Sequence, residues 1–222
     1  MGAAGPQRWE FARHALGVVA CLALGWFGIA QGIRIPLLAD ATYGFHALGH
    51  LMSWFLPEVY AAMMGSIFQV FIPLGLAGYF LLFHSDLLGV SLMLAWAGVS
   101  AHETGAYIAD APTGFIVLGF GHATHDWAFA LGPTGLDRLS SAGELGWFVQ
   151  ALGLVCVLAG MGFGTWGAVR ALMERPAVEQ AQAYLERMPV RRGDDDSYPV
   201  SGLGDDGWQA DSTARNWDPS GR

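Results

Sequence analysis

Long uncharged apolar segments constrain this chain more than any other feature. Residues 14–33 contain no Asp, Glu, Lys or Arg, and about 20 such residues are enough for a helix to cross the hydrocarbon of a bilayer. Similar segments cover residues 59–83, 87–101 and 145–169. The composition agrees, because 53% of the residues are hydrophobic and only 14% are charged, which is too apolar for an ordinary soluble domain. The sequence therefore predicts an all-α integral membrane bundle with about four spanning helices.

The arginines predict how these helices are oriented. Arg8 and Arg13 precede the first apolar segment, and those that follow the last one include Arg170, Arg175, Arg187, Arg191 and Arg192. The positive-inside rule then places both termini in the cytoplasm of a multi-pass bacterial inner membrane protein. Arg34, a lone charge after the first segment, disagrees with this orientation. The first segment also resembles a signal peptide. It is long, however, and lacks a good cleavage site after it, so we expect a retained anchor helix.

Charge and cysteine content exclude other classes of protein. The formal net charge of −8 argues against binding to nucleic acid, which needs a basic surface. Cys21 and Cys156 lie far apart in sequence, each within an apolar segment. They are predicted to be small buried residues rather than parts of a disulfide scaffold.

The chain is predicted to have three parts. Residues 1–13 form a cytoplasmic N-terminus, residues 14–175 form the transmembrane helical domain, and residues 176–222 form an acidic tail rich in Gly and Asp. Such a tail is disordered by composition, yet it contains Trp208 and Trp217, and Trp is a common anchor at interfaces. Two interpretations stay open: a segment that docks on other membrane subunits, and a solvated tail.

A pair of histidines stands out within residues 43–56. This segment is bounded by Pro57 and is too short to cross a bilayer alone, so it is predicted to be a half-helix packed within protein. His46 and His50 are four residues apart and project from one helix face, where they can bind one metal ion. In the zinc-protease motif, the residue after the first His is a Glu that activates water. Here that residue is Ala47.

Spacing alone leaves three roles for this pair: metal binding, haem or pigment ligation, and structural hydrogen bonds. Ionisable groups in membrane segments are costly and usually functional, and a zinc site needs at least a third ligand. The candidates are His102, Glu103, Asp110, His122, His125 and Asp126. His125 and Asp126 are the best of them, because they lie at a predicted helix start capped by Thr124. Asp126 has a second possible role, orienting a ligating histidine.

Several motifs follow one another in order along residues 41–140. They are Phe45-His46-x-x-Gly49-His50, Gly65-Ser66-x-x-Gln69 with Pro73, Tyr107-Ile108-Ala109-Asp110-Ala111, and His125-Asp126-Trp127. Together they resemble a family of bacterial membrane proteins related to site-2-protease-type zinc metallopeptidases. The resemblance implies that His46 and His50 bind zinc and that His125 or Asp126 completes the site. Since Ala47 replaces the catalytic Glu, it implies the scaffold and the metal but not the activity.

Three functions are consistent with these observations. The first is a non-catalytic, protease-derived accessory or assembly subunit of a larger membrane complex, with a photosynthetic or respiratory complex as a plausible host. The second is an active intramembrane zinc protease whose base comes from elsewhere, with Glu103 or Asp126 as candidates. The third is a subunit that binds haem or a pigment through His46, His50 or His102. Any haem would be noncovalent, because the sequence has no Cys-x-x-Cys-His motif.

Overall fold

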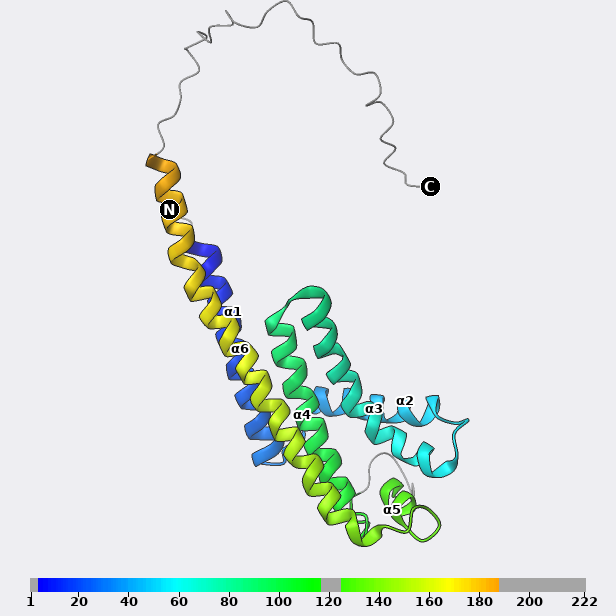
Figure 1. Ribbon diagram of the computed structural model, residues 1–222. Helices are drawn as coiled ribbons and strands as arrows, with labels where there is room; N and C mark the ends of the chain where they lie inside the picture. The colour runs from blue at the N-terminus through cyan, green and yellow to red at the C-terminus, as the bar shows by residue number, and fades with distance from the viewer. Residues whose placement is uncertain (1–3, 117–124, 188–222) are drawn as a thin grey trace, which may run out of the picture. The chain divides into compact units, whose positions relative to one another are not determined.

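All regular secondary structure in the described part of the chain is helical. The structure, a computed structural model, describes residues 4–116 and 125–187 (Figure 1). The α-helices are α1 (Ala4–Leu24), α2 (Pro36–Met52), α3 (Glu58–Tyr79), α4 (Leu87–Ala109), α5 (Asp126–Leu131) and α6 (Ala142–Arg187). Short π-helical segments, Gly25–Ala30 and Phe80–His84, extend α1 and α3, and a 3-10 turn, Leu139–Ser141, precedes α6. The predicted all-α fold is confirmed.

The chain divides into two units, Met1–Gln180 and Ala181–Arg222. The architecture described below is that of the first unit. The second unit contains the C-terminal residues of α6, which ends at Arg187. Trp208 and Trp217, the predicted docking residues, lie outside the described residues.

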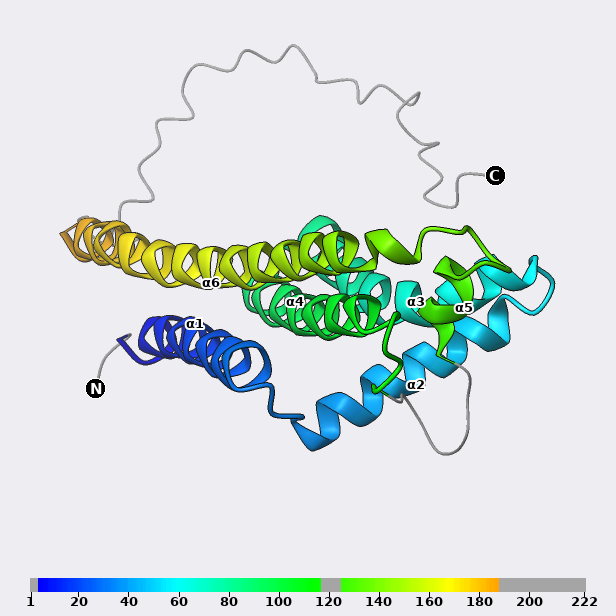
Figure 2. The same ribbon diagram turned by 90° about the horizontal axis from the view of Figure 1, so that it is seen from below.

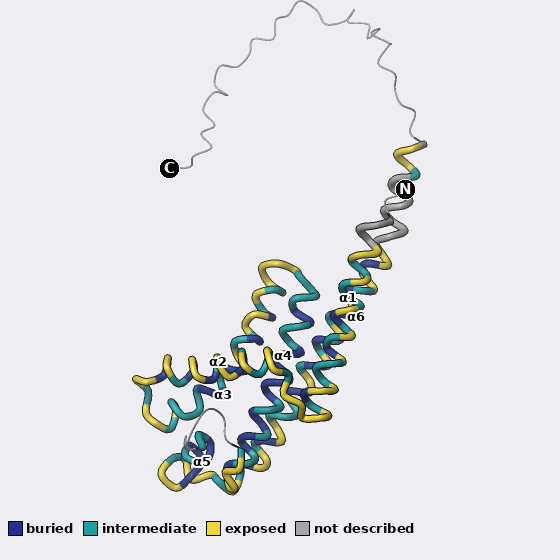
Figure 3. The backbone as a smooth tube through the Cα atoms, turned by 180° about the vertical axis from the view of Figure 1, so that it is seen from behind, coloured by how far each residue is buried: buried dark blue, intermediate teal, exposed yellow. Residues whose placement is uncertain are grey.

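Three helical stretches in the described residues are long and apolar enough to cross a membrane. They are Arg8–Ala30, Glu58–His84 and Leu139–Met173, and they agree with a helical membrane bundle. Helix α4, predicted as a further span, is not among them. It has buried residues along its whole length, from Val90 to Ile108 (Figure 3). The number of crossings and the side on which the termini lie stay predictions.

Two helices extend beyond the segments predicted for them. Helix α2 runs from Pro36 to Met52, whereas the half-helix was predicted within residues 43–56. Proline suits the first turn of a helix, because the missing N–H has no helical partner there. Helix α6 runs from Ala142 to Arg187, beyond both ends of the predicted apolar segment 145–169. Helix α2 runs obliquely to α4 and α6 (Figure 2) and packs against α3.

Helices α4 and α6 lie side by side (Figure 1), and they touch at their glycines. A Cβ atom added to Gly98 would lie 2.5 Å from the carbonyl oxygen of Gly153, and one added to Gly105 would lie 2.5 Å from that of Gly146. These pairs recur every seventh residue in opposite chain directions, so the helices are antiparallel. Without side chains at the crossing, the backbones approach closely, as membrane helices commonly do.

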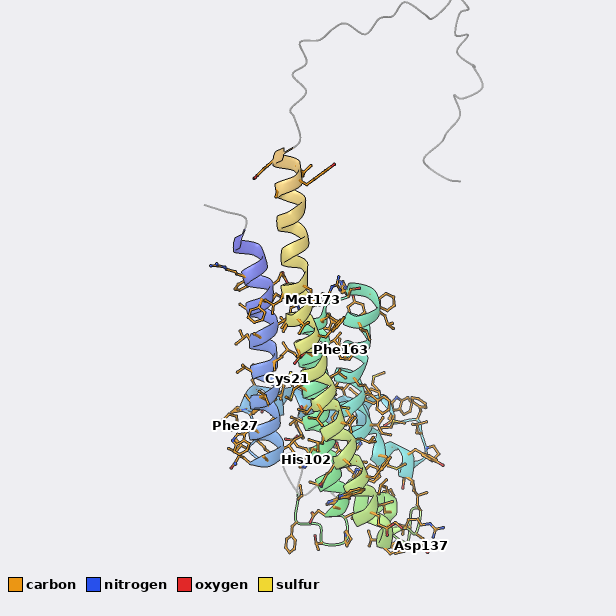
Figure 4. The ribbon with its side chains drawn as sticks, turned by 60° about the vertical axis from the view of Figure 1, so that its left-hand side comes forward. Cys21, Phe27, His102, Asp137, Phe163 and Met173 are labelled. Atoms are coloured by element: carbon orange, nitrogen blue, oxygen red, sulfur yellow. The ribbon has the colours of Figure 1, made fainter. Side chains whose placement is uncertain are left out.

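A serine continues the same series and connects α1 to it. The Ser91 hydroxyl on α4 donates to the carbonyl oxygen of Gly160 on α6 at 2.6 Å. The Sγ atom of Cys21 on α1 lies 3.2 Å from this hydroxyl, on the side of α1 that faces the other helices (Figure 4). Cys21 is a free, buried cysteine as predicted, and Cys156 is free and partly buried.

The glycine contacts predict a position-dependent effect of a single methyl group. We expect Gly153→Ala to lower the free energy of unfolding by about 1–3 kcal/mol, the usual cost of overpacking. Gly162→Ala in the same helix is the matched control, because an added Cβ there meets nothing within 4 Å. Unfolding of both variants in detergent measures the difference. Equal stability of the two variants would contradict close packing of α4 on α6.

Candidate metal centre

The two histidines of α2 are held by α3 through one nitrogen each. His46 Nδ1 lies 3.0 Å from the side-chain oxygen of Gln69, and His50 Nδ1 lies 3.0 Å from the carbonyl oxygen of Ala61. Both oxygens only accept hydrogen bonds, so each Nδ1 carries the proton. A neutral imidazole protonated at Nδ1 has its lone pair at Nε2. Each ring therefore presents a bare Nε2.

Asp126, the first residue of α5, faces these two nitrogens. Its Oδ2 atom lies 3.2 Å from His46 Nε2 and 3.4 Å from His50 Nε2. The two Nε2 atoms are 3.0 Å apart. The three atoms thus form a nearly equilateral triangle. Among the described residues, His46, His50 and Asp126 are the side chains placed closely enough together to hold a metal ion.

The size of this triangle suits a small divalent metal. Zinc binds nitrogen and oxygen ligands at about 2.0–2.2 Å, so neighbouring ligand atoms of a tetrahedral site are about 3.3 Å apart. The three observed separations bracket that value. Each donor atom points a lone pair at the others, and such an arrangement is repulsive unless a cation lies between them. The donor set therefore fits a divalent transition metal and leaves a fourth position for another ligand.

The charges in the cluster favour a cation as well. Burial raises the pKa of Asp126, but the attraction of an imidazole of His46 or His50 that has taken up a second proton at Nε2 outweighs this and holds the pKa at about 2. The carboxylate is therefore ionised at any physiological pH. Its hydrogen bond raises the pKa of His50. In the absence of metal, the cluster stabilises a proton in the place where a metal would lie.

Helix α3 shapes the space around the rings. A Cβ atom added to Gly65 would lie 2.5 Å from His50 Nε2 and 2.7 Å from His46 Nε2, so only glycine leaves room for both imidazoles. On α2, a Cβ atom added to Gly49, the residue before His50, would collide with the carbonyl oxygen of Met64 on α3. Close contact between α2 and α3 at these glycines brings the histidines to their hydrogen-bond partners.

Helices α4 and α5 complete the surroundings. The Gln69 amide donates to the hydroxyl of Thr104 on α4, which leaves its oxygen to accept from His46. The indole N–H of Trp127 donates to Ser66 on α3 at 2.9 Å, and Trp127 packs in a buried cluster with Tyr107 of α4. These contacts fix α5 and therefore Asp126. Gly65, Ser66 and Gln69 all belong to the motifs on which the family resemblance was based.

His125 does not belong to the group formed by His46, His50 and Asp126. It is the N-cap of α5, where its Nδ1 accepts the N–H of Ala128 at 3.2 Å. The cap predicted for Thr124 is therefore wrong. Thr124 and His122 themselves lie outside the described residues. Of the two adjacent candidates for the third donor, Asp126 is the one placed beside the histidines.

Asp110, His102 and Glu103 are not members of the three-donor group. Asp110 caps α4 and accepts the N–H of Ile116 at 2.6 Å, which together with the Thr113 hydroxyl lowers its pKa. His102 and Glu103 line a cavity of about 570 Å³ that also reaches His46. Ala47, the position of the missing Glu, is exposed, whereas His46 is buried.

Sequence reasoning found the histidine pair but missed most of its supports. A glutamine within an apolar span, Gln69, was a usable signal, because an amide there needs a partner. Tyr107 belongs to one of the motifs, but its packing with Trp127 had no comparable physical signal, since a buried tyrosine is common in any core. Comparisons with protein-family models, curated proteins and solved structures find no match to this chain, so the resemblance to zinc metallopeptidases stays a prediction from its motifs.

The space left by Gly65 predicts the effect of filling it. We expect Gly65→Ala to weaken binding of Zn²⁺ on the order of 10–100-fold, as changes beside metal ligands commonly do, because the methyl group displaces both imidazoles. Gly75→Ala on the same helix is the control, since its Cβ meets nothing within 4 Å. Zn²⁺ titration of the two purified variants gives the comparison, and equal affinities would contradict the geometry described.

Proposed function

We propose that this protein is a non-catalytic, metalloprotease-derived membrane protein that holds a zinc ion between His46, His50 and Asp126. We further propose that it serves as an accessory or assembly subunit of a larger membrane complex. One observation carries the metal assignment: three donor atoms converge at 3.0–3.4 Å, with both imidazole Nδ1 atoms already bonded to α3. A metal held by these ligands would join α2 to α5.

The alanine at position 47 supports the non-catalytic part of this proposal. A general base contributes about 10²–10⁴ to the rate, and it must lie within hydrogen-bond reach of the water that it activates. An alanine cannot accept a proton. In the described residues, the group that can hold a metal contains one carboxylate, Asp126, and that carboxylate is a ligand in this proposal.

Exposed apolar side chains support a role as a subunit. The end of α2 and the turn after it expose large apolar side chains, among them Leu51 at 68%, Trp54 at 81% and Phe55 at 68%. In a bilayer such a surface faces lipid or another protein. The convergence of the Nε2 atoms also disfavours haem ligation by His46 or His50, because an axial ligand needs a flat open space beyond that nitrogen.

The metal assignment predicts the metal content of the purified protein. We expect about one Zn²⁺ per chain after exposure to Zn²⁺ and removal of the excess, and loss of that ion in His46→Ala and Asp126→Ala. His84→Ala is the control, because His84 is exposed and bonds to Tyr79. Elemental analysis measures the ratio. A wild-type protein that retains no zinc under these conditions would sink the proposal.

A second candidate, an active zinc hydrolase, is favoured by the cavity beside His46. Glu103 lines this cavity and is the obvious substitute for the missing base. The non-catalytic proposal predicts no cleavage of fluorescently labelled casein or of a labelled transmembrane peptide by the zinc-loaded protein. Cleavage that is lost in Glu103→Gln but kept in Glu58→Gln would establish the second candidate in its place.

A further inference from the structure

One hydroxyl group contacts both the backbone and the side chain of Asp126. Tyr107 on α4 is only 3% exposed, and its hydroxyl oxygen accepts the N–H of Asp126 at 3.1 Å. The hydroxyl proton is then free to be donated, and Asp126 Oδ2 lies 3.5 Å away. This is the same oxygen that faces the two histidine nitrogens.

Asp126 needs such a restraint. It is the first residue of a helix of six residues, and the terminal torsion of an aspartate side chain is broad rather than confined to sharp rotamers. Without a partner on the protein side, the carboxylate could turn Oδ2 away from the histidines at little cost. A hydroxyl that bonds to the backbone N–H and lies beside Oδ2 restricts both the position of the residue and the rotation of its carboxylate.

We infer that Tyr107 is a positioning residue of the metal centre, which holds Asp126 Oδ2 toward His46 and His50. This inference rests on the proposed function, because it concerns the same donor group. Tyr107 acts through Asp126 and is not itself one of the three donors. Hydrogen-bond partners of metal ligands commonly contribute 10–100-fold to metal affinity, since they orient the ligand before the metal arrives.

The ring of Tyr107 is held in turn by His125. The two rings stack with their centroids 4.0 Å apart and their planes 26° apart. His125 is fixed at one end because its Nδ1 accepts the N–H of Ala128. This leaves its proton on Nε2, which points toward Asp110 Oδ2 at 3.6 Å. His125 was predicted from the sequence as a possible ligand. In this arrangement it instead supports Tyr107, which orients Asp126.

Asp110 anchors this arrangement at the end of α4. Its carboxylate accepts the N–H of Ile116 at 2.6 Å and the hydroxyl of Thr113. The motif Tyr107-Ile108-Ala109-Asp110 therefore supplies the positioning hydroxyl and, one turn later, the carboxylate that faces His125. This gives a physical reason for the co-occurrence of that motif with His125-Asp126-Trp127 in one chain.

The test compares Tyr107→Phe with the wild type, using the full chain in detergent. The phenylalanine keeps the ring stack and removes only the hydroxyl. We expect a 10–100-fold loss of Zn²⁺ affinity, measured by competition with a chromophoric chelator, and a changed visible absorption spectrum of the Co²⁺-loaded protein, which reports the ligand geometry. Tyr79→Phe is the matched control, because Tyr79 is 47% exposed and its hydroxyl bonds to His84. We expect wild-type affinity and spectrum from it.

Each outcome bears on the inference. Wild-type affinity and an unchanged Co²⁺ spectrum in Tyr107→Phe would overturn it, and so would a defect that appears only in Tyr107→Leu, which would indicate packing alone. A wild-type protein that binds neither metal would overturn the proposed function and this inference with it. If Tyr107→Phe does not fold, His125→Leu removes the stacked ring and leaves the hydroxyl. It is expected to weaken Zn²⁺ binding in the same direction, and unchanged affinity there would count against the inference.

Discussion

Direct contact between helix backbones is the constraint on which the rest of this structure depends. Lipid offers helices no hydrophobic reason to associate, so van der Waals contact over a close approach has to supply the attraction. Gly98 and Gly105 on α4 meet Gly153 and Gly146 on α6 in this way, and Gly49 on α2 meets the backbone of α3 at Met64. These crossings place α4 and α2 on their neighbours, and with them the polar groups that surround the histidines.

The packing of these helices determines which atoms of the polar cluster face one another. Two imidazoles and a carboxylate converge on one another, while their outward-facing atoms are already bonded to α3 and α4. Each neutral ring uses its only N–H to donate a hydrogen bond to α3. The interior of the cluster therefore has three acceptors and no donor. A cation between them satisfies all three acceptors at once, and separations of 3.0–3.4 Å fit a small one.

The fold and half of the site could be read from the sequence. The apolar segments gave the helical class, and the spacing of His46 and His50 gave the pair of donors. The third donor could not be chosen, since His125 and Asp126 are adjacent and both are good ligands. The choice depends on the start of α5, where His125 turns back to cap its own helix and Asp126 faces α2. Such a choice is made by tertiary contacts.

Other features were hidden for different reasons. The seven-residue spacing of small residues on α4 and α6 is visible in the sequence, but it points to packing only once the two helices are known to be neighbours. The start of α2 at Pro36 was missed because proline usually ends a helix, although the first turn of a helix tolerates it. Helix α4 is enclosed by other helices, so its outer surface need not be as apolar as that of a helix in lipid.

The placement of the three donors has a consequence for assembly of the protein in the cell. His46 and His50 are made early in synthesis, whereas Asp126 follows only after α3 and α4. The group cannot form until α5 has docked on both of those helices. A ligand that binds only the native arrangement stabilises it by mass action. Capture of a metal would therefore act as the last step of maturation, separating finished molecules from those in which the second half of the bundle has not closed on the first.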